Sequence, residues 1–354
     1  MNFYEKLLSI DKIKEKLMDD ESRVIFNARI AFMITKDEDS FIKTVWPFMR
    51  NMYCPDLTFA YDNNKKIDRE IIIFGSGHDG IMTKHVLDLC GYSASYYCDS
   101  DSKKIGKVVE GLQIISKEEL IEKYHECLVI LASRIYKLEM YKELAEIGFP
   151  IKNVVFPRLE ILCAFNERQY FDVLKSGRDE VFIDAGSYNG NTIEAFMSWT
   201  GGKYKKIYAF EPLEDQYKYI EHKSILNNWN NVILYKTAAW NKKEKLNFAN
   251  LDTGSRVVGE DTGIIIEGCD IDSMVKGEKI TYIKMDIEGS ELKALEGARR
   301  TIQRWKPKLA ISVYHKNEDI IELPLKILEL VPEYKFYLRH YSTEQWETIL
   351  YAYV

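Results

Sequence analysis

The chain has 354 residues and a formal net charge of −6, which is enough for two or three domains and excludes the strongly basic surface typical of nucleic-acid-binding proteins. No apolar run is long enough to span a membrane, and the charged N-terminus is unlike a signal peptide. We therefore expect a cytoplasmic protein with no nucleic-acid partner and no membrane span.

Residues 1–66 are predicted to be helical, because their apolar residues recur at roughly helical spacing. We interpret this region as a packing or dimerisation module, so a homodimer is compatible with the sequence. The six cysteines of the chain form no CxxC pair and do not cluster with histidines. We expect reduced thiols and no metal centre built on them.

Residues 67–157 are predicted to form a small Rossmann-like α/β domain. A buried strand over 71–74 leads into the turn GSGHDG, where Gly75, Gly77 and Gly80 match the GxGxxG pattern, and Asp99 ends the next strand. Three interpretations remain open: a scaffold whose site is empty, a site for a nucleotide-containing ligand such as a nucleotide-sugar, and a nicotinamide-dinucleotide site for redox chemistry.

The stretch from Val181 to Gly190, VFIDAGSYNG, reads as a buried strand, a tight turn and the start of a helix. Gly186 and Gly190 allow the backbone to approach a ligand closely. Asp184 would repel a dinucleotide pyrophosphate by about 4 kcal/mol at about 4 Å and an effective dielectric of about 20. S-adenosylmethionine has no phosphate and carries two cationic groups, so the acid favours this cofactor.

A second acid, Glu211, ends the next apolar run, KIYAFEP, 25 residues after Gly186. An acid at this spacing in a nucleotide-binding sheet grips the ribose diol of the ligand. We predict that Glu211 does so here, and that the nearby Ser187, Pro212 and Ala238 complete the cofactor site.

The rest of the chain predicts a doubly wound parallel sheet closed by an antiparallel hairpin, the architecture of a class I methyltransferase. The last two strands come from YKFYLRHY and WETILYAYV, which alternate in strand fashion across a short turn. Preceding strands are expected at 181–184, 206–211, 231–236, 280–286 and 308–314, with an additional one at 243–250. Helices are expected at 191–199, 213–227 and 290–304. We assign residues 158–354 to this domain.

Two further residues are candidates for the chemistry. Asp286 ends the strand of ITYIKMDIEG, and His315 ends the next strand, KLAISVYHK, so both should lie at the same sheet edge as Asp184 and Glu211. Asp286 is expected to contact the methyl acceptor or take its proton, and His315 to orient the acceptor or act as base. The alternatives are a helix cap for Asp286 and a structural role for His315. Acids near this strand end could hold magnesium, but their spacing alone assigns no metal.

Residues from about 165 to 354 resemble the FkbM family of S-adenosylmethionine-dependent methyltransferases. The resemblance rests on QYFD (169–172), VFIDAGSYNGNT (181–192), YAFEP (208–212), KMDIEGSELKALEGA (284–298), PKLAISVYHK (307–316) and FYLRHY (336–341). It implies methyl transfer to a hydroxyl group of a sugar, glycoconjugate or related small molecule. Residues 67–157 are similar to the nucleotide-sugar-binding domain of some sugar-modifying enzymes.

The sequence therefore favours an O-methyltransferase that uses S-adenosylmethionine and acts on a small molecule or glycan. Two alternatives stay open. One is a redox enzyme that binds NAD through residues 75–80. The other is a non-catalytic protein that binds the cofactor or a nucleotide-sugar.

Overall fold

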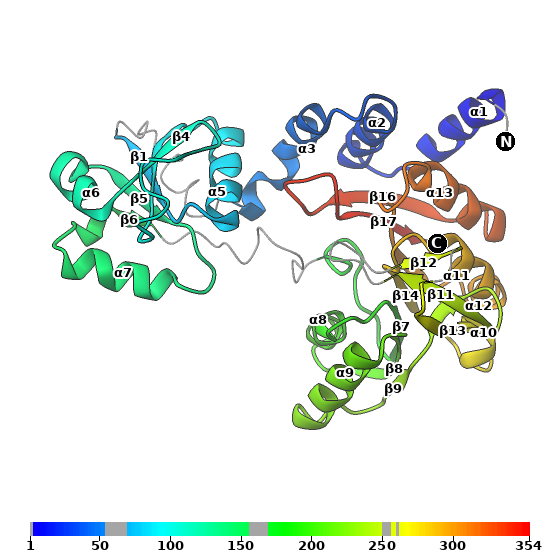
Figure 1. Cartoon of the computed structure of the whole chain (residues 1–354). Coiled ribbons are helices and arrows are strands. Elements are labelled where there is room, and N and C mark those ends of the chain that lie inside the picture. The colour runs from blue at the N-terminus through cyan, green and yellow to red at the C-terminus, as the bar shows by residue number, and fades with distance from the viewer. Residues whose placement is uncertain (1–2, 54–68, 156–168, 250–255, 260–261) are drawn as a thin grey trace. The chain divides into compact units, whose positions relative to one another are not determined.

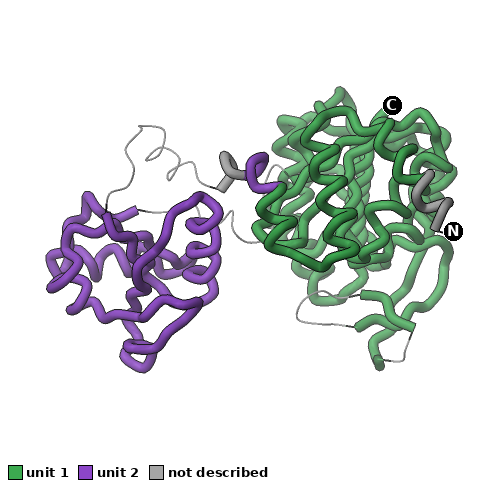
Figure 2. The backbone as a smooth tube through the Cα atoms, turned by 90° about the horizontal axis from the view of Figure 1, so that it is seen from above, with its two compact units in different colours: residues 1–44, 165–354 green, residues 45–164 purple. Residues whose placement is uncertain are grey.

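The computed structural model describes residues 3–53, 69–155, 169–249, 256–259 and 262–354 (Figure 1). The chain divides into two compact units, shown in green and purple in Figure 2. Unit 1 combines Met1–Thr44 with Phe165–Val354, and unit 2 is Val45–Ala164. The sequence placed residues 1–66 in a region of their own, whereas the first 44 residues pack with the C-terminal half. Residues 54–68 and 156–168, where the expected boundaries fall, lie outside the described residues.

Unit 1 is built on a seven-stranded sheet with the order β16-β17-β15-β14-β7-β8-β9. Neighbouring strands from β9 to β15 are parallel, and β17 runs antiparallel to both β15 and β16. The terminal hairpin predicted from the sequence is therefore confirmed, and its second strand is inserted into the sheet. The strands are β7 (Glu180–Ala185), β8 (Tyr204–Phe210), β9 (Val232–Tyr235), β14 (Tyr282–Met285), β15 (Lys308–Ser312), β16 (Lys335–His340) and β17 (Thr348–Tyr353).

The strand order reverses direction at β7. From β7 the chain proceeds outward to β8 and β9 and then returns to place β14 on the other side of β7. In open α/β sheets the ligand crevice lies at such a switch point, outside the carboxyl ends of the strands. We therefore expect the ligand site among the residues that follow β7, β8, β14 and β15.

The helices of unit 1 include one departure from the sequence prediction. The expected helix over 290–304 is divided at Ala298 into two helices. A Cβ on Gly297 would lie 1.9 Å from the Trp240 carbonyl oxygen, so the first helix packs directly on the backbone of Trp240 at this point. The helices are α8 (Asn191–Trp199), α9 (Glu214–Leu226), α10 (Ile271–Met274), α11 (Glu291–Gly297), α12 (Arg299–Trp305) and α13 (Asp319–Leu330).

A four-stranded sheet with the order β10-β13-β11-β12 accompanies the main sheet. It consists of β10 (Ala238–Trp240), β11 (Glu244–Ala249), β12 (Arg256–Val258) and β13 (Ile265–Asp270). The sequence predicted β11 alone of these four. The other three strands were missed, because two of them have only three residues and the sequence of the third, IIEGCD, does not alternate between apolar and polar residues.

The N-terminal helices are α1 (Phe3–Lys14), α2 (Asp20–Thr35) and α3 (Glu38–Tyr53). The first packs on α13 and the second on β16 (Figure 1). Leu17, between the two helices, forms an isolated parallel bridge with Phe336 of β16. Four apolar residues of this region are at most 2% exposed, so the region shares its core with the seven-stranded sheet. They are Ile13, Leu17, Ile25 and Phe26.

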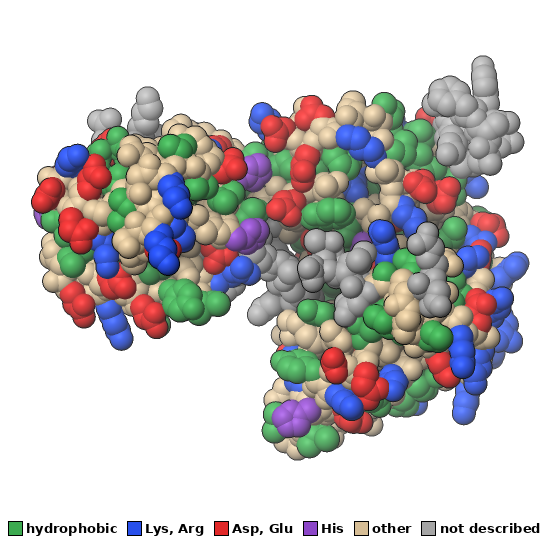
Figure 3. Space-filling view, in the orientation of Figure 1, with side chains coloured by type: hydrophobic (Ala, Val, Ile, Leu, Met, Phe, Trp, Pro, Cys, Tyr) green, Lys and Arg blue, Asp and Glu red, His purple; other side chains and the backbone are tan. Residues whose placement is uncertain are grey.

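Unit 2 is an α/β fold with a six-stranded sheet in the order β3-β4-β2-β1-β5-β6. Its elements are β1 (Ile71–Phe74), α5 (His78–Leu89), β2 (Ala94–Cys98), β3 (Val108–Val109), β4 (Leu112–Ile115), α6 (Lys117–Tyr124), β5 (Leu128–Leu131), α7 (Lys137–Glu146), a 3-10 turn (Ile151–Asn153) and β6 (Val154–Val155). On the face of unit 2 seen in Figure 3, acidic and basic side chains are interspersed. No helix within the described ranges has the length and apolar character needed to cross a membrane.

Candidate active site

The turn after β7 is pressed against the end of β14. Gly186 has φ +85°, and a Cβ at this position would lie 1.9 Å from the Asp286 carbonyl oxygen. Gly190 has φ +76°, and its Cβ would lie 2.9 Å from the Trp229 ring. Both positions therefore require glycine for conformation and for space. The turn is anchored to the neighbouring strand, because the N–H groups of Gly186 and Ser187 donate to the Phe210 carbonyl.

Asp184 is fully buried behind this turn and does not reach its surface. Its carboxylate lies 3.2 Å from the Lys284 ammonium, which is 2% exposed and donates a hydrogen bond of 2.7 Å to the Gly186 carbonyl. Burial raises the pKa of Asp184, and the Lys284 charge opposes that rise. The sequence suggested a direct electrostatic effect on the ligand, whereas in this arrangement Asp184 acts through Lys284, which holds the turn.

Glu211 lies beside the glycine turn as the sequence predicted for a ribose ligand. Its two carboxylate oxygens accept backbone hydrogen bonds of 3.0 Å, one from Tyr188 N–H and one from Leu213 N–H. Each oxygen keeps a further lone pair for a ligand hydroxyl. Burial raises the pKa of Glu211 to about 7, so a ligand that donates hydrogen bonds to the charged form would relieve an unfavourable desolvation.

The three remaining cofactor candidates lie in different settings. Ser187 is buried, and its hydroxyl donates to the Asp184 carbonyl oxygen at 3.1 Å. Pro212 is half-buried next to Glu211. Ala238 is the first residue of β10 and pairs with Gly268 of β13, so its position is fixed by the small sheet.

Asp286 follows β14 and is joined to Glu347 by hydrogen bonds on two sides. On one side, Tyr314 hydroxyl lies 3.2 Å from one Asp286 oxygen and 3.3 Å from a Glu347 oxygen. On the other side, Tyr170 hydroxyl donates to the second Asp286 oxygen at 2.7 Å, and Gln169 amide donates to both Tyr170 hydroxyl and the second Glu347 oxygen. The two carboxylates and three donors form a closed ring, which we call the Asp286–Glu347 ring.

The Asp286–Glu347 ring has ionised and neutral members. The pKa of Asp286 is lowered, because the charges of Lys284 and His315 outweigh burial. The pKa of Glu347 is raised to about 7 by burial and by the Asp286 charge. Burial and the same charge raise the pKa of Tyr170 and Tyr314 well above the usual value, so both phenols remain donors at neutral pH.

The sequence identified Asp286 but not its partners in the ring. Gln169 and Tyr170 appeared there only within the family motif QYFD, and Glu347 was not singled out. Tyr314 could have been predicted to lie in the site, because it directly precedes His315 at a strand end. Nothing in the sequence indicated Glu347, because its position depends on the insertion of β17 next to β15.

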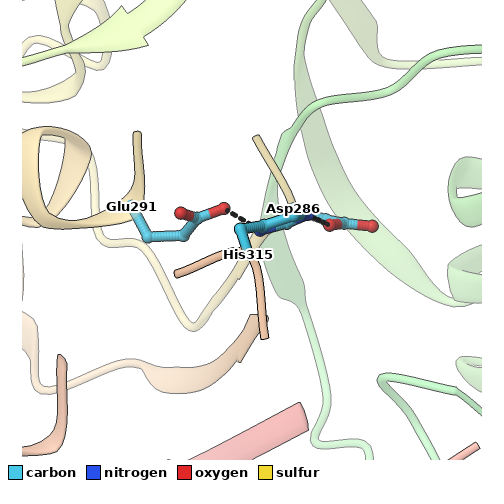
Figure 4. Close-up of side chains that lie close together, drawn as sticks. All are labelled: Asp286, Glu291 and His315. Carbon is cyan, nitrogen blue, oxygen red and sulfur yellow. Dashed lines mark ion pairs between the residues drawn. The ribbon is translucent and has the colours of Figure 1, made fainter. Parts of the chain in front are cut away.

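His315 lies between two acids, as Figure 4 shows. Its Nδ1 lies 3.0 Å from a Glu291 oxygen, and its Nε2 lies 3.4 Å from an Asp286 oxygen and 3.5 Å from a Glu288 oxygen. Burial disfavours the charged ring, but these carboxylates raise the pKa of His315 to about 10. At neutral pH, His315 is therefore a charged donor and has no free lone pair with which to take a proton.

Ligand atoms of Asp286, Glu291 and His315 lie within 4.8 Å of one another, which is compatible with a metal ion. However, the two acids face different ring nitrogens of His315. Glu291 also accepts the N–H of Ile287 at 2.9 Å. This arrangement matches an imidazolium held between two carboxylates, and we assign no metal to it.

Two glycines of the GxGxxG pattern, Gly75 and Gly80, serve the packing of unit 2. Gly75 has φ +111° and donates its N–H to the Cys98 carbonyl at 2.8 Å. A Cβ on Gly80 would lie 2.0 Å from the Gly75 carbonyl oxygen, so only glycine lets α5 approach the turn. Gly77 has no heavy atom within 4 Å of its Cβ position and begins α5.

Asp99, the expected ribose ligand of unit 2, is engaged within the protein. Its carboxylate accepts hydrogen bonds from Ser76 N–H and hydroxyl, and lies 3.0 Å from the Lys104 ammonium. Asp79 in the first turn of α5 pairs with Arg134 and places a negative charge near the position of a dinucleotide phosphate. A nucleotide-type ligand for unit 2 stays a prediction from the sequence.

Comparison with known proteins supports the fold. Residues 184–338 match the family model of the methyltransferase FkbM domain, and no curated protein matches the sequence. Among solved structures, the chain is similar to methyltransferase FkbM from Methylobacillus flagellatus at 19% identity and a TM-score of 0.50, over 94% of this chain and 99% of that chain.

Two other similar structures have lower TM-scores. An rRNA methylase from Streptococcus thermophilus has 18% identity and a TM-score of 0.34, over 52% of this chain and 91% of that chain. UDP-D-quinovosamine 4-dehydrogenase from Vibrio fischeri has 23% identity and a TM-score of 0.21, over 25% of this chain and 76% of that chain.

Proposed function

We propose that this S-adenosylmethionine-dependent methyltransferase methylates a hydroxyl group of a sugar, glycoconjugate or related small molecule. The proposal starts from the match of residues 184–338 to the methyltransferase FkbM domain. The observation that carries the proposal is Asp286, an ionised acid 23% exposed at the switch point of the sheet. An uncharged hydroxyl is a poor nucleophile and needs a neighbouring group to accept its proton.

The cofactor is expected across the Gly186 turn, with Glu211 binding its ribose hydroxyls and the half-buried Pro212 beside it. The bound cofactor supplies an activated methyl group on a sulfonium. The chain in turn must hold the acceptor oxygen in line with that group, and such orientation contributes roughly 7–11 kcal/mol. We expect Asp286 to contact the acceptor hydroxyl, while the charged His315, whose Nε2 lies 3.4 Å from an Asp286 oxygen, stabilises the Asp286 carboxylate.

An exposed aromatic residue that packs against Tyr314 supports a sugar-like acceptor. Trp346 is 44% exposed, and its ring packs edge-on against Tyr314 with centroids 6.3 Å apart. Its free face offers apolar surface beside polar groups, the combination that ring-shaped polar ligands use. Three predictions from the sequence remain predictions: that the protein has no nucleic-acid partner, that it can form a homodimer and that it is cytoplasmic.

The test is to incubate the full-length protein with isotope-labelled S-adenosylmethionine and a panel of glycans, nucleotide-sugars and ribosomal RNA, and to locate the label by mass spectrometry. We expect label on a carbohydrate oxygen. Label on ribosomal RNA instead would overturn the proposed acceptor class.

Replacing the acid tests its role with that acceptor. Asp286→Asn is expected to lower turnover about 10²–10⁴-fold, because general-base assistance has this magnitude, while cofactor affinity measured by calorimetry stays near the wild-type value. The matched control is Asp215→Asn, an exposed acid on α9, which should change neither quantity. Turnover of Asp286→Asn equal to that of the wild type would remove Asp286 from the mechanism.

A further inference from the structure

The Asp286–Glu347 ring contains two carboxylates that compete for one proton. Tyr314 hydroxyl lies 3.2 Å from Asp286 and 3.3 Å from Glu347, and a single hydroxyl proton can be donated to only one of them at a time. We propose that Glu347 is the final acceptor of the proton released by the methylated hydroxyl, and that Tyr314 transfers it from Asp286. The inference rests on the proposed function and adds a residue that the family resemblance did not supply.

Glu347 is better suited than Asp286 to keep that proton. The groups that face Glu347 are Asp286, Tyr314, Tyr170, Gln169 and His315. Burial and the Asp286 charge raise the pKa of Glu347 to about 7, against the opposing effects of Gln169, His315 and Tyr314. The pKa of Asp286 is lowered by Lys284 and His315. A base works best when its pKa lies near the working pH, so the proton should move on from Asp286.

The step balances without any further reactant. The acceptor oxygen forms its bond to the methyl carbon as the methyl–sulfur bond breaks, and its own O–H bond breaks toward Asp286. Tyr314 then donates its proton to Glu347 and takes the one held by Asp286. The net change is a methylated oxygen, a neutral thioether and a protonated Glu347, which loses its proton to solvent before the next turnover.

The N-terminal helices hold the turn that carries Glu347. Arg29 of α2 donates to the Gln345 carbonyl at 2.6 Å, and a Glu38 oxygen of α3 accepts the Gln345 N–H at 2.8 Å. Glu347 itself has φ +64°, a conformation that a non-glycine residue adopts only when its surroundings enforce it. Arg29 and Glu38 thus act as positioning residues for a proton acceptor that lies more than 300 residues away in the sequence.

The first test needs no methyl acceptor. The Glu347 signal is identified in carbon NMR spectra of the full-length protein with labelled glutamate side chains, by its loss in Glu347→Gln. We expect this signal to titrate near pH 7. In Gln169→Leu it should titrate at higher pH, because Gln169 stabilises the charged carboxylate. A Glu347 signal that titrates below about pH 5.5, the range of ordinary glutamates, would overturn the proposal.

The second test uses the acceptor found in the panel. The wild-type rate should decrease as the pH is lowered below about 7, because Glu347 becomes protonated. The rates of Glu347→Gln and Tyr314→Phe should not show this decrease and should be about 10²-fold lower than the wild-type rate at pH 7. Glu347→Asp should recover part of the rate, and Gln169→Leu should shift the fall to higher pH. Wild-type turnover in Glu347→Gln would overturn the inference. If no hydroxyl in the panel is methylated, the acceptor proposal fails, and the NMR titration still decides the state of Glu347.

Discussion

Two glutamates of the candidate site, Glu211 and Glu347, have pKa values raised to about 7. In both cases the largest cause is the loss of solvent around the carboxylate. Their neighbours differ, because Glu211 accepts two backbone N–H groups and Glu347 faces a second acid. Glu211 is therefore suited to accept hydrogen bonds from hydroxyl groups, and Glu347 is suited to accept a proton.

This difference predicts a pH-dependent affinity for the cofactor. Ribose hydroxyls would bind the charged form of Glu211, so binding lowers its pKa, and affinity should rise as the pH rises through 7. A group with a pKa near 7 is roughly nine-tenths protonated at pH 6, so calorimetry should find affinity about tenfold weaker at pH 6 than at pH 8.

The control for this prediction is Glu211→Gln, which keeps the shape of the side chain and removes its titration. It should bind more weakly at pH 8, by about 1.5–3 kcal/mol, and its affinity should vary less with pH than that of the wild type. Equal pH dependence in the two proteins would show that another group is responsible.

At the scale of elements, the site depends on how closely the turn after β7 approaches the end of β14. Gly186 is where this contact is closest, since a Cβ there would meet the Asp286 carbonyl. Asp286 is also the residue proposed to contact the acceptor. A substitution at Gly186 should therefore disturb both the turn after β7 and the position of Asp286.

Gly186→Ala can be compared with Gly202→Ala to separate steric overlap from backbone strain. Gly202 has φ +74° and no heavy atom within 4 Å of its Cβ position, so alanine there should cost only the left-handed strain of about 1–2 kcal/mol. Gly186→Ala should lose a further ~1–3 kcal/mol from overpacking and weaken cofactor binding. Urea unfolding followed by tryptophan fluorescence measures the loss of unfolding free energy in both variants. Equal losses would mean that the strands move apart at little cost.

The central elements could be predicted from sequence because each is a continuous apolar run that ends in a polar residue. This holds for β7, β8, β14 and β15, and it located Asp184, Glu211, Asp286 and His315 at the correct strand ends. The rest depends on strand order in space. Sequence spacing could not show that β17 would lie between β15 and β16, nor that this would bring Glu347 within hydrogen-bonding distance of Tyr314. The pairing of Asp184 with Lys284 follows from strand register.

At the scale of the whole molecule, the turn after β7 and the Asp286–Glu347 ring lie in unit 1, and the glycine pattern at 75–80 lies in unit 2. Each unit has a sheet and a buried core of its own. Units of this kind usually fold as separate cooperative domains, which gives the role of unit 2 a direct test.

Gly80→Ala should lower the stability of unit 2 alone, because a Cβ there would overlap the Gly75 carbonyl. In calorimetric melting of the full-length protein, we expect one transition to shift down and a second to stay in place, with unchanged affinity for S-adenosylmethionine. Gly77→Ala, at a position with open space, is the matched control. A loss of cofactor affinity in Gly80→Ala would instead show that unit 2 supports the methyltransferase site.

The bridge between Leu17 and Phe336 has a consequence during synthesis. A ribosome adds about 5–20 residues per second, so the strand that covers Leu17 is made roughly 15–60 s after Leu17 itself. Throughout that interval the apolar side chains of α1 and α2 lack their final partners. Until then, α1 and α2 expose apolar surface of the kind that holding chaperones bind, and an early stop in translation would release a chain with this surface uncovered.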